Sequence, residues 1–239
     1  DQLLDALLER ARGVTATATV PVANALGRVL AAPQTSAITV PPADNSAMDG
    51  YALRHADWTD ESRALPLSQR IAAGSAPAPL APGTAARIFT GAEIPAGADT
   101  VVMQEHCEGT DAGVRLLRLP EHGANIRRRG QDIVSGQRVL SAGHRLRPQD
   151  LGLAASLGVA RVAVYRRLRV AILSTGDELV EPGEAAGPGR IYNSNRFTLQ
   201  GQLTAWGFEA VDLGVVPDEP GAVRAAMLRA AREADVIIT

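Results

Sequence analysis

The sequence predicts a multidomain protein of mixed α+β and α/β class. Three successive patterns carry this prediction: helical spacing at the start, short apolar runs between glycines and prolines in the middle, and alternating strands and helices at the end. A chain of 239 residues is long enough for one large domain or for two to three small ones. The three patterns therefore indicate separate structural regions.

The spacing predicts an amphipathic helix over residues 2–12, and Gly13 is a suitable residue to end it. The residues that fall on its apolar face are Leu3, Leu4, Leu7, Leu8 and Ala11. This apolar stripe requires a surface to cover it, and a partner subunit is one surface of that kind.

A β-rich region is expected between about residues 15 and 142. Short apolar runs bounded by Gly and Pro indicate β-hairpins in a small barrel or sandwich. The clearest runs are 87–89, 100–103 and 114–117. Residues 72–83 are rich in Ala, Pro and Gly, which favours a loop. Helical spacing returns over residues 147–156.

The end of the chain alternates between strands and helices. Residues 168–173 form a mostly apolar run, typical of a buried parallel strand. Strands at 210–213 and 236–238 alternate with helices at 196–206 and 220–234. This β-α-β-α-β order implies right-handed crossovers and a doubly wound sheet. The sequence stops at the third strand, which would leave a strand edge exposed, so we expect the chain to be the front part of a longer protein, truncated at its C-terminus.

Composition excludes several classes of protein. No apolar run approaches the ~20 residues of a membrane helix, and the first residues do not resemble a signal peptide. The single cysteine, Cys107, excludes an internal disulfide and a Cys-based zinc site. A net charge of -2 and an aromatic content of 3% argue against a nucleic-acid partner. We therefore expect a cytoplasmic protein that binds small molecules or other proteins, without a membrane or nucleic-acid partner.

Acidic residues follow two of the three expected strands. Asp177 and Glu178 come after the first strand, and Asp218 follows the second. Ligands of open α/β sheets bind outside the carboxyl ends of the strands, so we expect these carboxylates to line one crevice. Clustered carboxylates suit a hard cation, most often Mg²⁺ shared with a phosphate. Alternatively, Asp218 caps the helix that begins near Pro220.

Two kinds of segment in the β-rich region permit both a structural and a functional interpretation. Residues 127–129 are consecutive arginines, and Asp132 lies just beyond them. Arginine forks match phosphates and oxyanions, but such charges also discourage pairing at a strand edge, and Asp132 could serve only as their ion-pair partner. Residues 45–50 and 90–92 have the composition of turns, which requires no function.

Four segments taken together resemble the molybdopterin molybdenumtransferase family (MoeA-type molybdenum insertases, which include the E domain of gephyrin). The segments are DNSAMDGY at 44–51, TGA at 90–92, NIRRRGQD at 125–132 and STGDEL at 174–179. The resemblance runs from near Asp1 to Thr239, and the family continues beyond that point into the rest of this domain and a further domain. It divides the chain into three parts. These are an elongated dimerisation module (1–44 with 138–167), an inserted β-rich, barrel-like domain (45–137), and a partial α/β molybdopterin-binding domain (168–239).

The resemblance implies that molybdenum is inserted into adenylylated molybdopterin, giving molybdenum cofactor and AMP. Molybdate is the second substrate, and Mg²⁺ is the implied cofactor. A molybdopterin adenylyltransferase would be the upstream partner that supplies the substrate. The resemblance further implies a homodimer whose site lies in a cleft between subunits. The α/β domain of one subunit forms one wall, and the β-rich domain of the other forms the facing wall.

The family's site residues carry over by position. The implied catalytic residues are Asp49, Asp132, Glu178 and Asp218. The implied substrate-binding residues are Thr90, Arg127, Ser174, Thr175 and Gly176. The implied metal ligands are Asp177, Glu178 and Asp218. Whether a molybdate oxygen or water attacks the phosphorus is left open.

Two other functions stay open. The chain could be a molybdopterin-binding or scaffold protein without catalysis, or it could be a molybdopterin adenylyltransferase. The intact acids at Asp49, Asp132, Glu178 and Asp218 argue against the first. The β-rich domain argues against the second, because the adenylylating relatives lack it.

Overall fold

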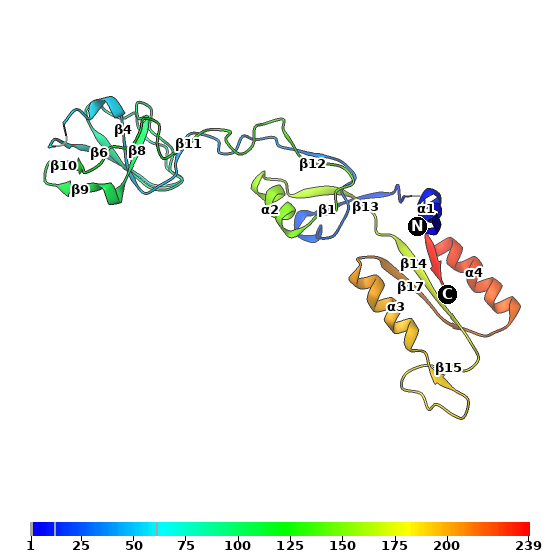
Figure 1. Ribbon diagram of the computed structural model, residues 1–239. Helices are drawn as coiled ribbons and strands as arrows, with labels where there is room; N and C mark the ends of the chain where they lie inside the picture. The colour runs from blue at the N-terminus through cyan, green and yellow to red at the C-terminus, as the bar shows by residue number, and fades with distance from the viewer. Residues whose placement is uncertain (1, 12, 61) are drawn as a thin grey trace. The chain divides into compact units, whose positions relative to one another are not determined.

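The computed structural model describes residues 2–11, 13–60 and 62–239, and it divides into two compact units (Figure 1). Unit 1 joins residues 1–34 to residues 140–239, and unit 2 comprises residues 35–139. The two ends of the chain therefore fold together, and the middle of the chain forms a unit of its own. Within the described residues, no helix is both long and apolar enough to cross a membrane.

Unit 2 consists of short strands and two 3-10 helices. Its strands are β3 (Asn45–Ser46), β4 (Gly50–Leu53), β5 (Ala64–Leu65), β6 (Leu67–Ile71), β7 (Ala85–Ile88), β8 (Thr100–Met103), β9 (Cys107–Thr110), β10 (Gly113–Leu116) and β11 (Ile126–Arg127). Its 3-10 helices are η2 (His55–Asp57) and η3 (Gln104–His106). One sheet has the strand order β6-β7-β4-β8, a second has the order β5-β10-β9, and β11 pairs with β3.

The expectation of a β-rich region is confirmed, but the described strands form open sheets and no closed barrel. The three apolar runs chosen from the sequence lie largely on β7, β8 and β10. β9 and β10 form the expected hairpin, whereas β4 pairs with β7 on one side and β8 on the other. β6 runs parallel to β7, because the loop over 72–83 carries the chain back to the end from which β6 started.

Two apolar clusters fill unit 2, and β8 contributes to both. Val101 packs in the first cluster with Ile71 and Ile88, and Val102 packs in the second with Leu53. Neighbouring residues of a strand point to opposite faces, which is why adjacent valines serve different clusters. Gly50 lies where β4 approaches β8, and a Cβ atom there would lie 1.9 Å from the Val102 carbonyl oxygen. Close packing therefore requires glycine at this position.

The described residues of unit 1 form four α-helices. They are α1 (Gln2–Arg10), α2 (Pro148–Ser156), α3 (Ser194–Ala205) and α4 (Pro220–Glu233), with a 3-10 helix η1 (Val22–Asn24). Its strands are β1 (Thr17–Pro21), β13 (Arg161–Tyr165), β14 (Arg169–Thr175), β15 (Leu179–Val180), β16 (Ile191–Tyr192), β17 (Glu209–Val216) and β18 (Val236–Ile238). Where the chain passes between the units, β2 (Gln34–Thr35) pairs with β12 (Arg138–Leu140).

The expected first helix is confirmed as α1, which ends at Arg10. Arg12, the last residue of the expected helix, lies outside the described residues. Leu3, Leu4 and Leu8 are exposed in this single chain, to 71%, 53% and 62%. The apolar stripe is thus available to a surface outside the chain.

The α/β part of unit 1 has the expected element order. Its parallel sheet has the order β17-β14-β18, so that the first strand, β14, lies in the middle. The crossover from β14 to β17 and the crossover from β17 to β18 run in opposite directions across the sheet, and right-handed crossovers of opposite direction place their helices on opposite faces. Figure 1 shows α3 and α4 on either side of the sheet accordingly. The residues of β14 from Val170 to Leu173 are buried, which explains their continuous apolar run.

A buried carboxylate stabilises the start of α2. The Asp150 side chain is 5% exposed, and its Oδ2 accepts hydrogen bonds from the backbone N–H of Arg147 at 2.8 Å and from His144 Nε2 at 2.7 Å. The side-chain hydrogen bonds from Arg147, and then that from His144, hold the pKa of Asp150 well below its ordinary value.

We expect Asp150→Asn to lower the free energy of unfolding at pH 7 by about 1–2 kcal/mol, because Arg147 and His144 lose a charged acceptor. A depressed folded-state pKa stabilises the protein above the unfolded-state pKa of about 3.9 and loses that contribution at lower pH. The difference between the variant and the wild type should therefore shrink between pH 7 and about pH 3. Urea unfolding at both pH values measures it, with Asp111→Asn in the exposed β9–β10 turn as control. An equal difference at both pH values would contradict the assignment.

Candidate functional site

A cavity of about 510 Å³ lies at the carboxyl ends of β14 and β18 in unit 1. Ser174, Thr175, Glu178 and Thr239 line it, together with the first residues of α3. β14 is the central strand: the chain passes from it to β17 on one side and then crosses to β18 on the other. Open α/β sheets bind their ligands at such a point. Of the three acids expected to line a crevice here, Glu178 lines this cavity, whereas Asp177 and Asp218 are not among its lining residues.

The N-terminus of α3 forms a second wall of this cavity. Asn193 is the N-cap residue and is 3% exposed. Its Oδ1 accepts a hydrogen bond from the backbone N–H of Arg196 at 3.4 Å, and its buried Nδ2 has no partner among the described residues. Ser194 and Asn195, which follow it, also line the cavity. Free backbone N–H groups and the positive end of a helix bind phosphates.

This wall was not predicted from the sequence, because the helix was expected to begin at Arg196, whereas α3 begins at Ser194. A signal was present in the sequence, because Asn193 and Ser194 are residue types that favour the N-cap, and they stand at the start of α3.

The two acidic loops meet beside the cavity. Asp177 Oδ1 accepts a hydrogen bond from the backbone N–H of Asp218 at 3.2 Å, and Arg190 donates to the Asp177 carbonyl oxygen. Gly176 has a φ of +141°, and a Cβ atom there would lie 2.7 Å from Glu178 Oε2. The glycine therefore leaves the space that the Glu178 carboxylate occupies at the edge of the cavity.

These acids do not form a metal site by themselves. Among residues 2–11, 13–60 and 62–239, no group of three or more His, Cys, Asp or Glu side chains is arranged to hold a metal ion. Asp177 instead holds the Asp218 loop, and Glu178 lies against Gly176. The side chains of the described residues therefore do not make a complete Mg²⁺ site on their own. The metal role of Asp177, Glu178 and Asp218 stays a prediction.

Arg196 positions the loop that borders the cavity. Its guanidinium pairs with Asp212 on β17 at 2.7 Å and with Glu181 after β15 at 2.5 Å. Burial acts to raise the pKa of Asp212, but the hydrogen bonds from Arg196 and from the Gly214 backbone outweigh it, and the pKa lies below its ordinary value. Arg196 therefore fixes the segment after β15 to the central sheet.

In unit 2, three of the four sequence segments converge on β3. The Ser46 backbone N–H donates to the Ala92 carbonyl at 2.9 Å, and the Ser46 carbonyl accepts from Gly91 at 2.8 Å. On the other side, Ala47 donates to the Asn125 carbonyl at 2.9 Å, and Ile126 pairs with Ser46 in the β11–β3 ladder. The segments around 46, 91 and 126 are therefore neighbours in space.

Asp49 and Thr90, two of the predicted site residues, are in direct contact. Asp49 Oδ1 accepts hydrogen bonds from the Thr90 backbone N–H at 2.8 Å and from Thr90 Oγ1 at 2.7 Å. These bonds, the backbone bond first, lower the pKa of Asp49. Asp49 is thus an ionised acceptor that holds the two turns together.

Arg127 and Asp132, two further predicted residues, form an ion pair with 2.5 Å between Nη2 and Oδ2. Both side chains are more than 40% exposed, so the pair lies open to a ligand. The adjacent Arg128 and Arg129 bind Asp44 through a side chain and a backbone N–H, respectively. The backbone hydrogen bond from Arg129, more than the side-chain bond from Arg128, lowers the pKa of Asp44. The arginine run is thereby fixed to the segment that precedes β3.

Asn45 was not among the predicted site residues. It lines a cavity of about 340 Å³ in unit 2, together with Gly74, Gly91 and Glu93. Its Oδ1 is buried and has no hydrogen-bond partner among the described residues. Within residues 45–50, only Asp49 was expected to have a chemical role, and the turn composition gave no reason to single out Asn45. The predicted residues thus fall into two groups: 174–178 and Asp218 in unit 1, and Asp49, Thr90, Arg127 and Asp132 in unit 2.

We expect Gly176→Ala to lower the free energy of unfolding of unit 1 by about 1–3 kcal/mol, because alanine rarely adopts the φ of this residue and its Cβ would displace Glu178. Urea unfolding followed by Trp206 fluorescence, in a Trp58→Phe background, measures the loss. Gly187→Ala is the matched control, since a Cβ atom there meets nothing within 4 Å. A loss no larger than that of the control would show that Gly176 is not conformationally required.

Comparison with known proteins gives the same family along the whole chain. Residues 1–158 match the MoeA N-terminal region (domain I and II), and residues 171–239 match a probable molybdopterin binding domain. The molybdopterin molybdenumtransferase of Haemophilus influenzae is 42% identical over 241 residues, which cover all of this chain and 59% of that relative. The molybdopterin molybdenumtransferase of Nostoc sp. is 40% identical over 218 residues, which cover 89% of this chain and 50% of that relative.

A solved structure confirms the fold. The molybdopterin biosynthesis moeA protein of Pyrococcus horikoshii OT3 superposes with a TM-score of 0.89 at 33% identity, over 99% of this chain and 64% of that one. The chain spans 50–59% of the length of the two curated relatives. Since the N-terminal region of MoeA accounts for well over half of the residues, the chain belongs to the MoeA family.

Proposed function

We propose that the protein acts in molybdenum cofactor biosynthesis as a molybdopterin molybdenumtransferase. It would take adenylylated molybdopterin from an upstream adenylyltransferase, insert molybdenum from molybdate, and release AMP. The observation that carries this proposal is the cavity at the carboxyl end of β14, where the N-terminus of α3 faces Glu178. This cavity lies in the part of the chain that matches a probable molybdopterin binding domain. A cytoplasmic location is part of the proposal.

The phosphates of the substrate would bind at the N-terminus of α3. The helix has 12 residues, so its dipole is fully developed at that end. The unpartnered Asn193 Nδ2 and the hydroxyls of Ser174, Thr175 and Ser194 add hydrogen-bond donors. The volume of about 510 Å³ falls in the range typical of cavities for small organic ligands.

Glu178 would act on the group that attacks the adenylyl phosphorus. In the reaction, an oxygen of molybdate or of water bonds to that phosphorus, and the anhydride oxygen leaves with the pterin phosphate. Glu178 lines the cavity and is exposed, so its carboxylate is available to orient the attacking oxygen or to accept its proton. Mg²⁺ favours few carboxylates together with substrate phosphates. With the substrate bound, Glu178 and Asp218 would be the residues to hold Mg²⁺, which would neutralise phosphate charge, and Asp177 would position the Asp218 loop.

Asp49, Thr90, Arg127 and Asp132 would form the facing wall, supplied by the partner subunit of a homodimer. In support, the Arg127–Asp132 pair is exposed, and Asp49 is an ionised acceptor fixed by Thr90. Arg127 would contact a phosphate or oxyanion, and the two aspartates would orient the pterin or bound water. The exposed Leu3, Leu4 and Leu8 of α1 would contribute apolar area to the dimer interface.

We expect Glu178→Gln to slow AMP release from adenylylated molybdopterin by at least about tenfold, with an unchanged unfolding midpoint. The assay uses the full-length protein with Mg²⁺, with and without molybdate. Glu184→Gln, an exposed glutamate in the neighbouring β15–β16 loop, is the matched control and should retain full activity. Unchanged turnover in Glu178→Gln would remove Glu178 from the mechanism. Tight pterin binding in the wild type, without any AMP release, would instead favour the binding or scaffold function.

The two-subunit site makes a separate prediction. We expect Asp49→Asn and Glu178→Gln proteins, each weakly active alone, to regain activity when the two chains are combined in one heterodimer. One of its two sites would then carry both substitutions, and the other would carry neither. Differently tagged, co-expressed chains allow the heterodimer to be purified before AMP release is measured. If each site came from a single chain, the heterodimer would be no more active than its parents.

A further inference from the structure

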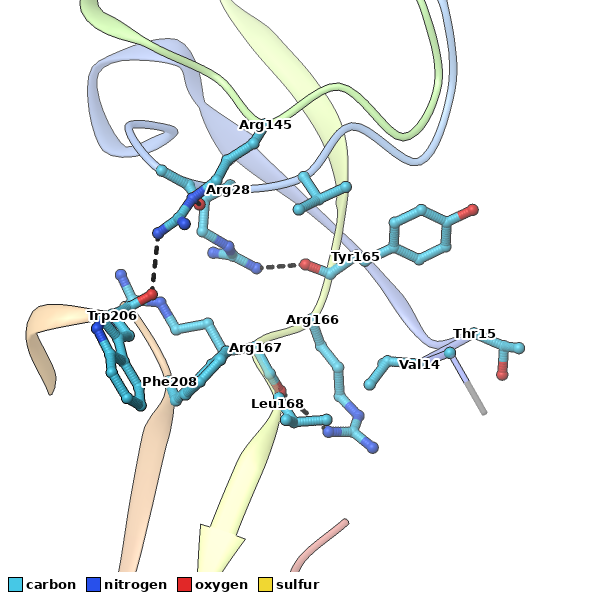
Figure 2. A pocket seen from close by; sticks show the side chains of 14 residues that line it. Val14, Thr15, Arg28, Arg145, Tyr165, Arg166, Arg167, Leu168, Trp206 and Phe208 are labelled. Atoms are coloured by element: carbon cyan, nitrogen blue, oxygen red, sulfur yellow. Dashed lines mark hydrogen bonds between the residues drawn. The ribbon is translucent and has the colours of Figure 1, made fainter. Parts of the chain in front are cut away.

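A second cavity in unit 1 lies at the opposite end of the central strand. Its volume is about 640 Å³, and its lining includes Arg166, Arg167 and Leu168, which precede β14, and Trp206 and Phe208, which precede β17 (Figure 2). β14 has seven residues and therefore spans roughly 23 Å at about 3.3 Å per residue. This cavity is thus separate from the proposed substrate site, which lies beyond the carboxyl end of the same strand.

The lining carries positive charge and no carboxylate. Arg28, Arg145, Arg166 and Arg167 are among its residues, and none of the lining residues is Asp or Glu. Arg166 is neutralised from outside the cavity, because both of its terminal nitrogens bind Asp235, at 2.6 and 2.7 Å. The remaining three arginines join no ion pair among the described residues, and together they carry uncompensated charge.

Each of these three arginines has donors to spare. Arg145 uses Nε and Nη2 to bind the carbonyl oxygens of Gly27 and Trp206, which are neutral acceptors. Arg28 binds the Tyr165 carbonyl through Nη2 at 2.8 Å, but its buried Nε has no partner. Arg167 is exposed and makes no side-chain hydrogen bond within the described residues. Burial, and then the charge of Arg167, lower the pKa of Arg28.

Aromatic surface lies next to this charge. Trp206 and Phe208 contact each other edge to face, with 6.3 Å between their ring centres, and Trp206 is 52% exposed. Figure 2 shows both rings beside Arg145 and Arg167 at one side of the cavity. Guanidinium forks recognise phosphate oxygens with matched geometry, and an exposed indole provides a flat apolar surface on which a planar ring can stack.

We propose that this cavity binds a small phosphate monoester that carries an aromatic ring, such as a nucleoside monophosphate. The dianionic phosphate would be held by Arg28, Arg145 and Arg167, and the ring would lie against Trp206. Arg167 and Trp206 precede β14 and β17, whereas Arg28 and Arg145 belong to the part of unit 1 that contains the paired strands β1 and β13. Such a ligand would therefore connect these two parts of unit 1. The site is independent of the proposed molybdenum insertion.

The test measures binding of three probes, AMP, inorganic phosphate and adenosine, to the full-length protein in a buffer with EDTA. Trp206 fluorescence reports on this cavity directly in a background in which Trp58 and any tryptophan outside residues 1–239 are replaced by Phe. We expect saturable binding of AMP, weaker binding of phosphate, and adenosine binding that is weaker than that of AMP by at least tenfold. Adenosine binding equal to that of AMP would overturn the proposal, as would a lack of AMP binding.

Two variants separate the two sites. Arg167→Gln removes a guanidinium without a structural partner and should weaken AMP binding at least tenfold, whereas Arg224→Gln, an equal change of charge on the exposed face of α4, should leave it unchanged. Glu178→Gln should also leave the Trp206 signal unchanged. Binding that is lost in Glu178→Gln, or that is unaffected in Arg167→Gln, would place the ligand elsewhere and overturn the proposal. Neither result would bear on molybdenum insertion.

Discussion

The burial of β14 is the constraint on which unit 1 depends. Parallel partners hydrogen-bond to both of its edges and helices cover both faces of the sheet, so the residues between them must be apolar. Polar chemistry is thereby confined to the two ends of the strand. Because β14, β17 and β18 run in the same direction, hydroxyls, acids and a helix N-terminus gather at one end, and the arginines of 166–167 gather at the other. The two cavities are consequences of one buried strand.

In unit 2 the motif residues have structural duties that account for much of their identity. Gly50 is required by the carbonyl of Val102, Asp49 is bonded twice to Thr90, and Asp44 holds the arginine run. The structural interpretation therefore accounts for these residues. It does not account for the exposed Arg127–Asp132 pair or for the Asn45 Oδ1 atom, which has no hydrogen-bond partner among the described residues. In unit 2, the polar atoms available to bind a ligand are therefore those that do not hold the fold together.

The sequence predicted the α/β part well because its signals are local. A few consecutive residues are enough to predict each of its elements. Examples are the apolar run of β14, the proline at the start of α4 and the strand at 236–238. Pairing in unit 2 is not local, and the parallel β6–β7 pair could not be told from a hairpin. Asp177, Glu178 and Asp218 were predicted as metal ligands because acids after neighbouring parallel strands lie at the same edge of a sheet. The hydrogen bond from the Asp218 backbone N–H to Asp177 depends on the geometry of the two loops, which that rule does not predict. The arginine cavity was missed since Arg28, Arg145 and Arg167 are far apart in sequence.

The two ends of the sheet differ in how they can bind an anion. Near Glu178 a phosphate would meet a carboxylate, and the N-terminus of α3 supplies only about half of a positive charge to offset it. A pyrophosphate substrate therefore requires an additional positive charge, either from a metal ion bound together with it or from a cationic side chain of the facing wall. This agrees with the absence of a preformed metal site among the described residues. At the other end, three arginines that have no carboxylate partner among the described residues carry the charge themselves. Binding there requires no metal, so dependence on Mg²⁺ distinguishes the two sites on physical grounds.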